Sequence, residues 1–75
     1  MKIERPQLRT TVSESDLLAI CAAIVGGATY SAAAMAAGVR PSALRRLKNT
    51  DPAVALRLRR AWQEQARRLL AAHRR

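Results

Sequence analysis

Apolar residues recur every three or four positions early in the chain, which is the spacing of one face of a helix. This series consists of Leu17, Ile20, Cys21 and Ile24. Ser13 precedes it and is followed three residues later by Asp16, an arrangement that resembles a capping box. The pattern therefore predicts a helix that starts after Ser13, runs to about Val25 and ends at the pair Gly26-Gly27.

Caps and helix breakers predict two shorter helices next. Thr29 is a suitable N-cap for a helix from Tyr30 to about Ala37, and Gly38 stops that helix. Proline is favoured in a first helical turn, since the amide proton that it lacks would be unpaired there. Pro41 therefore predicts a third helix from about Pro41 to Lys48.

Asp51 and Pro52 repeat this arrangement and predict a fourth helix that continues to about Ala72, roughly 20 residues or about 30 Å. One stripe of this helix is expected to consist of Ala55, Leu58, Trp62, Ala66 and Leu69. Residues 1–12 contain Pro6 and no sustained helical period, so we expect a flexible, extended N-terminal arm there.

These elements predict an all-α protein with one domain over residues 13–75. A three-helix core that contains a helix-turn-helix is followed by a long basic C-terminal helix from about residue 52. The expected core consists of Leu17, Ile20, Ile24, Val39, Leu44, Leu47, Leu58 and Trp62.

The region between the second and third predicted helices has the spacing of a helix-turn-helix. Ala34 is small enough for the next helix to cross closely, and Gly38 permits the left-handed backbone of a sharp turn. Val39 fills the turn, while Leu44 and Leu47 anchor the third helix one turn apart.

The net charge of the chain predicts that this helical protein binds an anionic partner. The chain has 14 Lys and Arg against 5 Asp and Glu, a net charge of +9. Basic and acidic residues balance over residues 1–30, so the whole excess lies in residues 31–75. Such asymmetry suits a polyphosphate or an anionic membrane surface. The single cysteine excludes an internal disulfide, and no apolar run approaches a bilayer span, so we expect a cytoplasmic protein.

The third predicted helix carries the candidate DNA contacts, because its two leucines turn one side inward. The side chains expected to read bases from the opposite side are Ser42, Arg45, Arg46 and Asn49. Arginine can bond guanine bidentately in the major groove, and asparagine can do the same for adenine. The residues expected to neutralise phosphates are Arg40, Lys48, Arg57 and Arg60. The alternative for this helix is the solvated basic face of a small bundle.

A family resemblance follows from these residues. Residues 36–47 read AAGVRPSALRRL, and Asp51-Pro52 then opens a helix rich in Arg, Gln and Glu. The stretch from Leu17 to Arg68 resembles the N-terminal helix-turn-helix domain of phage small terminase subunits, and it is also similar to homeodomain-like helices of transposases. The resemblance implies recognition of a viral packaging site, location in the host cytoplasm and cooperation with a large terminase subunit. Transcription regulation is the alternative role for a DNA-binding protein of this kind.

The end of the fourth helix is expected to extend beyond the core and to support a homodimer or higher homo-oligomer. The expected interface consists of Trp62, Ala66, Leu69 and Leu70. A frayed, arginine-rich tail is the simpler alternative. The alternative function is a protein interaction module or small inhibitor that docks through this stripe; a membrane-surface role ranks below it. An N-terminal arm that reaches the minor groove with Lys2, Arg5 and Arg9 is less favoured than a plain terminus.

Enzymatic function is not expected. His73 is the only histidine, and Cys21 falls on the predicted buried face of its helix. The sequence holds no phosphate-binding loop and no cluster with metal-ligand spacing. We therefore expect neither a cofactor nor a metal ion.

Overall fold

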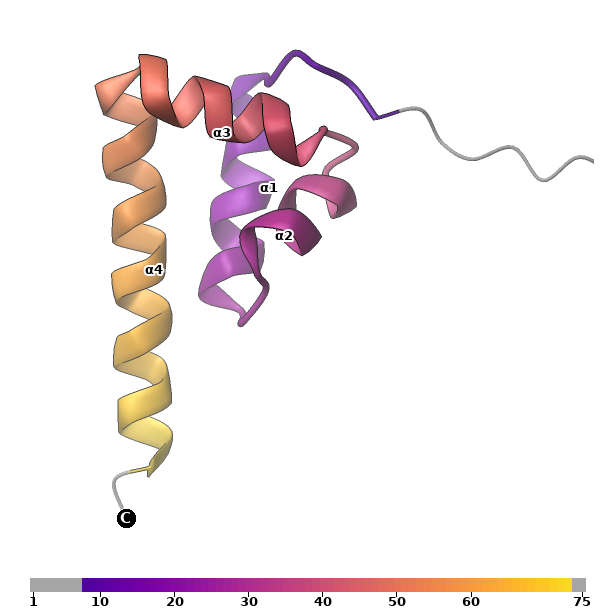
Figure 1. Ribbon diagram of the computed structural model, residues 1–75. Helices are drawn as coiled ribbons and strands as arrows, with labels where there is room; N and C mark the ends of the chain where they lie inside the picture. The colour runs from indigo at the N-terminus through magenta and orange to yellow at the C-terminus, as the bar shows by residue number, and fades with distance from the viewer. Residues whose placement is uncertain (1–7, 74–75) are drawn as a thin grey trace, which may run out of the picture.

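The computed structural model describes residues 8–73, and these residues fold into four α-helices (Figure 1). The helices are α1 (Glu14–Val25), α2 (Tyr30–Ala36), α3 (Pro41–Thr50) and α4 (Pro52–His73). The predicted all-α class is confirmed. Within residues 8–73, no helix combines the length and the apolarity that crossing a bilayer requires.

The four predicted helix starts are confirmed, three of them with side-chain caps, while α3 begins at Pro41 without one. The Ser13 hydroxyl accepts a hydrogen bond from the Asp16 amide at 3.1 Å, and the Asp16 carboxylate accepts one from the Ser13 amide at 3.0 Å. Thr29 caps α2 in the same way through the Ala32 amide. The Asp51 carboxylate accepts a bond from the Ala53 amide at 3.0 Å at the start of α4. Local side-chain bonds of this kind satisfy amides that lack a helical partner.

Helix α3 is two residues longer than predicted. The Thr50 hydroxyl donates to the Arg46 carbonyl at 2.9 Å, which supplies a partner for a carbonyl near the end of the helix. Asn49 therefore lies within the last turn of α3 rather than beyond it.

Most of the predicted core residues are buried. The buried apolar residues are Leu17, Ile20, Ile24, Ala33, Ala34, Val39, Leu44, Val54, Leu58 and Ala61. Leu47 and Trp62, which the sequence also placed in the core, are half-buried and pack against its margin. Alanines supply three of these ten positions, and side chains of this size allow packed helices to approach closely.

The turn between α2 and α3 has the conformation predicted for it. Gly38 has a φ of +77°, in the left-handed region that side chains with a Cβ rarely adopt. Val39 and Ala34 are fully buried, as the expected plug and the expected close contact between helices.

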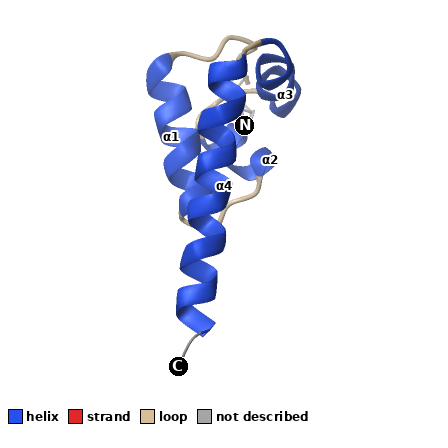
Figure 2. Ribbon diagram, turned by 90° about the vertical axis from the view of Figure 1, so that its left-hand side faces the viewer, coloured by secondary structure: helices blue, strands red, loops and turns tan. Residues whose placement is uncertain are grey.

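Helices α1 and α4 lie side by side, α3 crosses one end of the molecule, and α2 packs on α1 and α3 (Figure 1). A single residue, Asp51, separates α3 from α4. The C-terminal part of α4 extends past the other three helices (Figure 2). The orientation of α3 is therefore coupled directly to that of the longest helix.

The buried face of α4 is turned relative to the predicted stripe. Val54, Leu58 and Ala61 face the core, and the Gln65 amide continues this line by donating to the Ile24 carbonyl at 2.7 Å. Ala55 and Trp62 are only half-buried, while Ala66 and Leu69 are exposed. Burial of Leu58 and exposure of Ala66 and Leu69 beyond the core agree with the prediction, whereas Ala55 and Trp62 lie at the margin of the buried face rather than at its centre.

The segment before α1 is held against the turn between α2 and α3. The Arg9 amide donates to the Gly38 carbonyl, and the Arg40 amide donates to the Arg9 carbonyl, both at 2.8 Å. The Arg9 guanidinium also donates to Asp16 at 2.7 Å and to the Ala37 carbonyl at 2.9 Å. Arg9 thus joins the start of α1 to the end of α2.

The Arg9 bond to Asp16 should make stability depend on pH in the acid range. The hydrogen bond from Arg9, followed by that from the Ser13 amide, lowers the pKa of Asp16 to about 2. An unfolded aspartate titrates near 3.9, so the ionised carboxylate stabilises the fold fully above about pH 4 and loses this effect as the pH falls to 2. We expect urea unfolding to show a stability difference between wild type and Asp16→Asn that is constant above pH 5 and shrinks below pH 4. A difference that persists unchanged at pH 2 would contradict this.

Candidate nucleic-acid interface

The outward side of α3 carries the polar side chains that the sequence assigned to base reading. Ser42, Arg45, Arg46 and Asn49 are all exposed. Leu44, one step around the helix from Arg45, is only 2% exposed and fixes the rotation of α3 against the core. The structure therefore brings these four side chains together on one open surface at one end of the molecule.

Two hollows border this surface. One is lined by Tyr30 and Ser31 of α2 together with Arg45 and Lys48. In it the Lys48 ammonium lies 5.1 Å from the centre of the Tyr30 ring, a cation–π distance, and Tyr30 meets the Trp62 ring edge to face at 5.2 Å. The contact with Tyr30 therefore holds the Lys48 side chain of α3 against the start of α2.

The second hollow lies on the other side of α3, against the segment before α1. It is a groove of about 480 Å³, and its lining includes Thr10, Thr11, Arg40, Ser42 and Arg46. Arg45 and Arg46 thus border different hollows, because adjacent residues of a helix point about 100° apart.

Within residues 8–73, acidic side chains pair with basic residues of α4 and of the segment before α1, but with none of α3. Three carboxylates form ion pairs: Asp16 with Arg9 at 2.7 Å, Glu14 with Arg57 at 2.8 Å, and Glu64 with Arg67 at 3.4 Å and Arg68 at 3.9 Å. The cations without an ion pair among residues 8–73 are Arg40, Arg45, Arg46, Lys48, Arg59 and Arg60. Four of these six lie on α3 or immediately before it, so positive charge is concentrated there.

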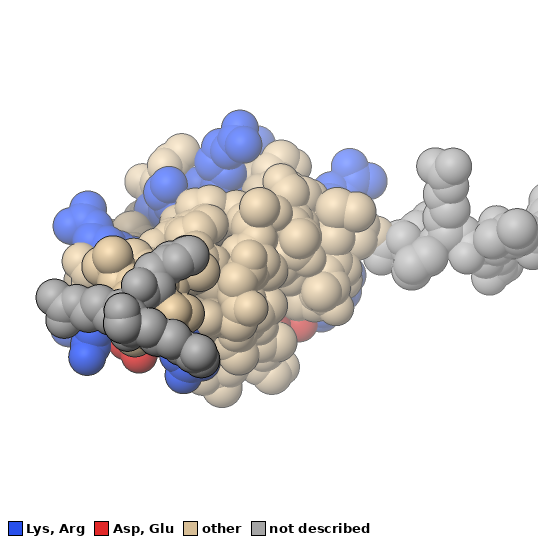
Figure 3. All heavy atoms as spheres, turned by 90° about the horizontal axis from the view of Figure 1, so that it is seen from below, with Lys and Arg blue, Asp and Glu red and all other residues tan. Residues whose placement is uncertain are grey.

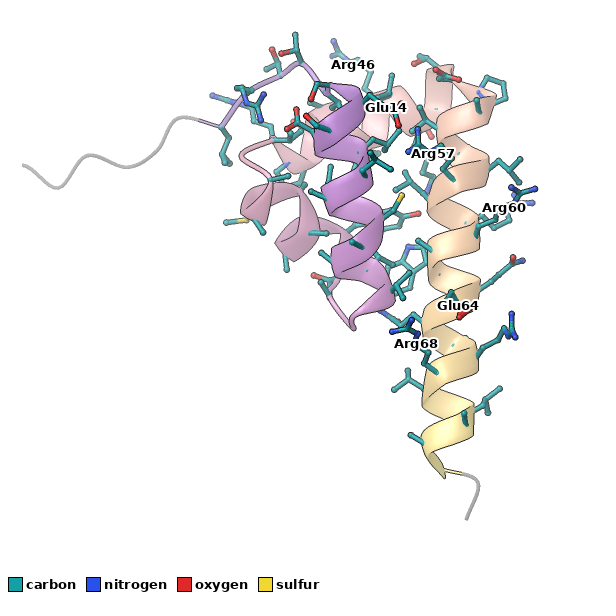
Figure 4. All side chains as sticks on the ribbon, turned by 180° about the vertical axis from the view of Figure 1, so that it is seen from behind. Glu14, Arg46, Arg57, Arg60, Glu64 and Arg68 are labelled. Carbon is teal, nitrogen blue, oxygen red and sulfur yellow. The ribbon has the colours of Figure 1, made fainter. Side chains whose placement is uncertain are left out.

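Arg57 and Arg60, two of the four predicted phosphate contacts, lie away from α3. Arg57 points toward Glu14 between α1 and α4, while Arg60 points outward from α4 (Figure 4). The hydrogen bond from Arg57 lowers the pKa of Glu14, and the same bond raises the pKa of Arg57. The structure thus brings only Arg40 and Lys48 of this set close to the predicted base-reading residues.

The end of the molecule opposite α3 has a different character. No residue of α1 after Asp16, of α2 or of the turn between these two helices is charged. In the view from this end, Lys and Arg lie around the rim and the middle is free of charged side chains (Figure 3). The positive charge is therefore distributed unevenly over the surface.

The predicted oligomer interface is divided between two environments. Trp62 packs on Tyr30 at the margin of the core, and its indole N–H is buried without a hydrogen-bond partner among the described residues. Ala66, Leu69 and Leu70 are exposed on the projecting part of α4. The structure does not bring Trp62 into the same open surface as the two leucines.

The sequence did not indicate that Thr10 and Thr11 would lie beside α3. Arg9 places them there through bonds to residues 28 or more positions away, and no local pattern predicts such contacts. Two predicted arm residues, Lys2 and Arg5, lie outside the described residues.

Comparisons with models of known protein families, with curated proteins and with solved structures returned no match to this chain. The function is therefore inferred from the geometry and the charge of the α3 surface.

Proposed function

We propose that the protein binds duplex DNA by inserting the outward side of α3 into the major groove. The observation that carries this proposal is a group of four cations that make no ion pair within residues 8–73, Arg40, Arg45, Arg46 and Lys48, which surrounds exposed Ser42 and Asn49. Base edges offer hydrogen-bond acceptors to Arg and paired donors and acceptors to Asn, and phosphates attract the cations at the sides.

The arrangement of α2 and α3 supports a helix-turn-helix mode of binding. In that mode the second helix of the pair lies in the groove while the first crosses the DNA backbone. Here α2 and α3 are in contact and are joined by the tight turn at Gly38, and Ala34 of α2 is fully buried. Helix α3, with ten residues, is about 15 Å long and can present two to three turns to the groove.

The resemblance of residues 17–68 to phage small terminase subunits supports recognition of a packaging site, with a large terminase subunit as a further partner. Transcription regulation is the other role that the same DNA contacts would serve. A homo-oligomer formed through exposed Leu69 and Leu70 would place several α3 helices along one duplex. Selection of bound fragments from random duplexes separates the two roles, because packaging favours spaced direct repeats and a dimeric regulator favours a palindrome.

The decisive measurement is the affinity for a labelled duplex at several salt concentrations, with fluorescence anisotropy as the readout. Each phosphate contact adds about −0.9 to the slope of log K against log salt. With phosphate contacts from Arg40 and Lys48, and a third if one arginine of α3 meets the backbone, we expect a slope of about −2 to −3. Failure to bind any duplex at 50 mM salt would refute the proposal.

Docking of another protein is the second candidate function. The projecting end of α4 exposes Leu69 and Leu70 to 54% and 67%, which favours an apolar contact there. Apolar docking depends little on salt, so the same titration with a candidate partner in place of DNA distinguishes the two functions.

A further inference from the structure

The groove between the segment before α1 and α3 has one wall that does not belong to a helix. This wall is the extended stretch after Arg9, and it is fixed at its start. The Arg9 backbone forms bridging bonds to Gly38 and Arg40, and its guanidinium binds Asp16 and the Ala37 carbonyl. The position of this wall is therefore set by α1, by the end of α2 and by the turn that precedes α3.

The groove is lined in part by apolar Val12, Ala43 and Leu47, and its polar side chains have the chemistry of a phosphate site. Arg40 and Arg46 supply two guanidinium groups, while Thr10, Thr11 and Ser42 supply hydroxyl donors. No carboxylate lines it within the described part of the chain. Arginine and hydroxyl side chains are among the groups that proteins use to contact DNA phosphates.

Arg46 is placed to serve this groove. It points outward from α3 near the start of α1 (Figure 4), and its guanidinium makes no ion pair within residues 8–73. Arg45 borders the opposite hollow beside Tyr30 and Lys48. A helix in the major groove has a phosphate backbone on each side, and Arg45 and Arg46, which point about 100° apart on the outward side of α3, border different hollows.

We propose that this groove holds a backbone phosphate of the bound duplex, that Arg46 is its main ligand, and that Thr10 and Thr11 complete the site. This inference rests on the DNA binding proposed above. It moves Arg46 from the base-reading residues to the phosphate contacts, places the Ser42 hydroxyl in the same groove, and leaves Arg45 and Asn49 to read bases. Arg9 acts as a positioning residue, since it holds the second wall in place.

The test compares four variants on one set of duplexes that differ in sequence. Arg46→Ala removes the proposed ligand, and Thr11→Glu introduces a carboxylate into the wall of the groove. Their matched controls are Arg67→Ala and Gln63→Glu, which make the same changes of charge at exposed positions of α4. All four positions are exposed, and circular dichroism verifies that each variant keeps its helices.

Arg46→Ala is expected to weaken binding to every duplex by a similar factor, about fivefold at 0.15 M salt, and to reduce the magnitude of the salt slope by about 1. Thr11→Glu is expected to weaken binding at least as much, with both controls changing it less than twofold. An Arg46→Ala variant that alters the ranking of sequences at unchanged slope, or a Thr11→Glu variant that behaves like Gln63→Glu, would overturn the groove assignment while DNA binding stands. A wild-type protein that does not bind duplex DNA would overturn both the groove assignment and the proposed DNA binding.

Discussion

Replacement of Leu58 by alanine is expected to cost about 2–5 kcal/mol of the free energy of unfolding. Leu58 is fully buried on α4, within the core cluster that includes Ile20 and Ile24 of α1. Small domains are stable by only about 0.05–0.15 kcal/mol per residue, or roughly 4–11 kcal/mol for this chain. The substitution therefore removes a large share of the total, and a substantial unfolded population is expected near 37 °C.

The matched control for this substitution is Leu56→Ala, two residues earlier on the same helix. Leu56 is 46% exposed, so its truncation is expected to cost less than about 1 kcal/mol. Urea unfolding followed by circular dichroism measures both variants. Equal midpoints for the two would show that Leu58 does not occupy the centre of the core.

Joint replacement of Arg45 and Arg46 by alanine is expected to have the largest effect on DNA binding. A bidentate base contact contributes about 1–3 kcal/mol to discrimination, and the loss of one phosphate contact adds roughly 1 kcal/mol. The combined loss of about 2–4 kcal/mol corresponds to roughly a 30- to 1000-fold weaker affinity. Both side chains are exposed, so stability should change little.

The control for this double variant is the joint replacement of Arg67 and Arg68 by alanine. It removes the same charge from the projecting end of α4, where both arginines share Glu64. If affinity depended only on net charge, the two double variants would weaken binding equally. Such a result would remove α3 from the proposed DNA contact.

The helix starts could be predicted from the sequence because their causes are local. Ser13, Thr29 and Asp51 each bond amides two or three residues away, and prolines begin α3 and α4. The left-handed turn at Gly38 is local in the same sense. Structure that depends on residues a few positions apart can be recognised directly in the sequence.

The features that sequence analysis missed depend on distant contacts. Two of these features are contacts between different elements, the Arg9 bridge to Gly38 and Arg40 and the bond from Gln65 to Ile24. The third is the burial of Asp16. The Arg9 bridge also gives the candidate interface its second hollow, and the ion pair of Arg57 with Glu14 is a further contact between distant elements. The exposed side of α3 was predictable from its two leucines, whereas the surroundings of each arginine on that side were not.

The single residue between α3 and α4 would have a consequence for several copies bound to one duplex. Because Asp51 is the only residue between the two helices, the 22-residue α4 has little freedom to rotate relative to α3. The direction of its C-terminal end is therefore set by the orientation of α3 on the DNA. The rotation of one binding site relative to the next around the DNA axis would then set the direction in which each copy's α4 projects. Sites about one turn of DNA apart would direct the tips to the same side of the duplex, and sites half a turn apart would direct them to opposite sides.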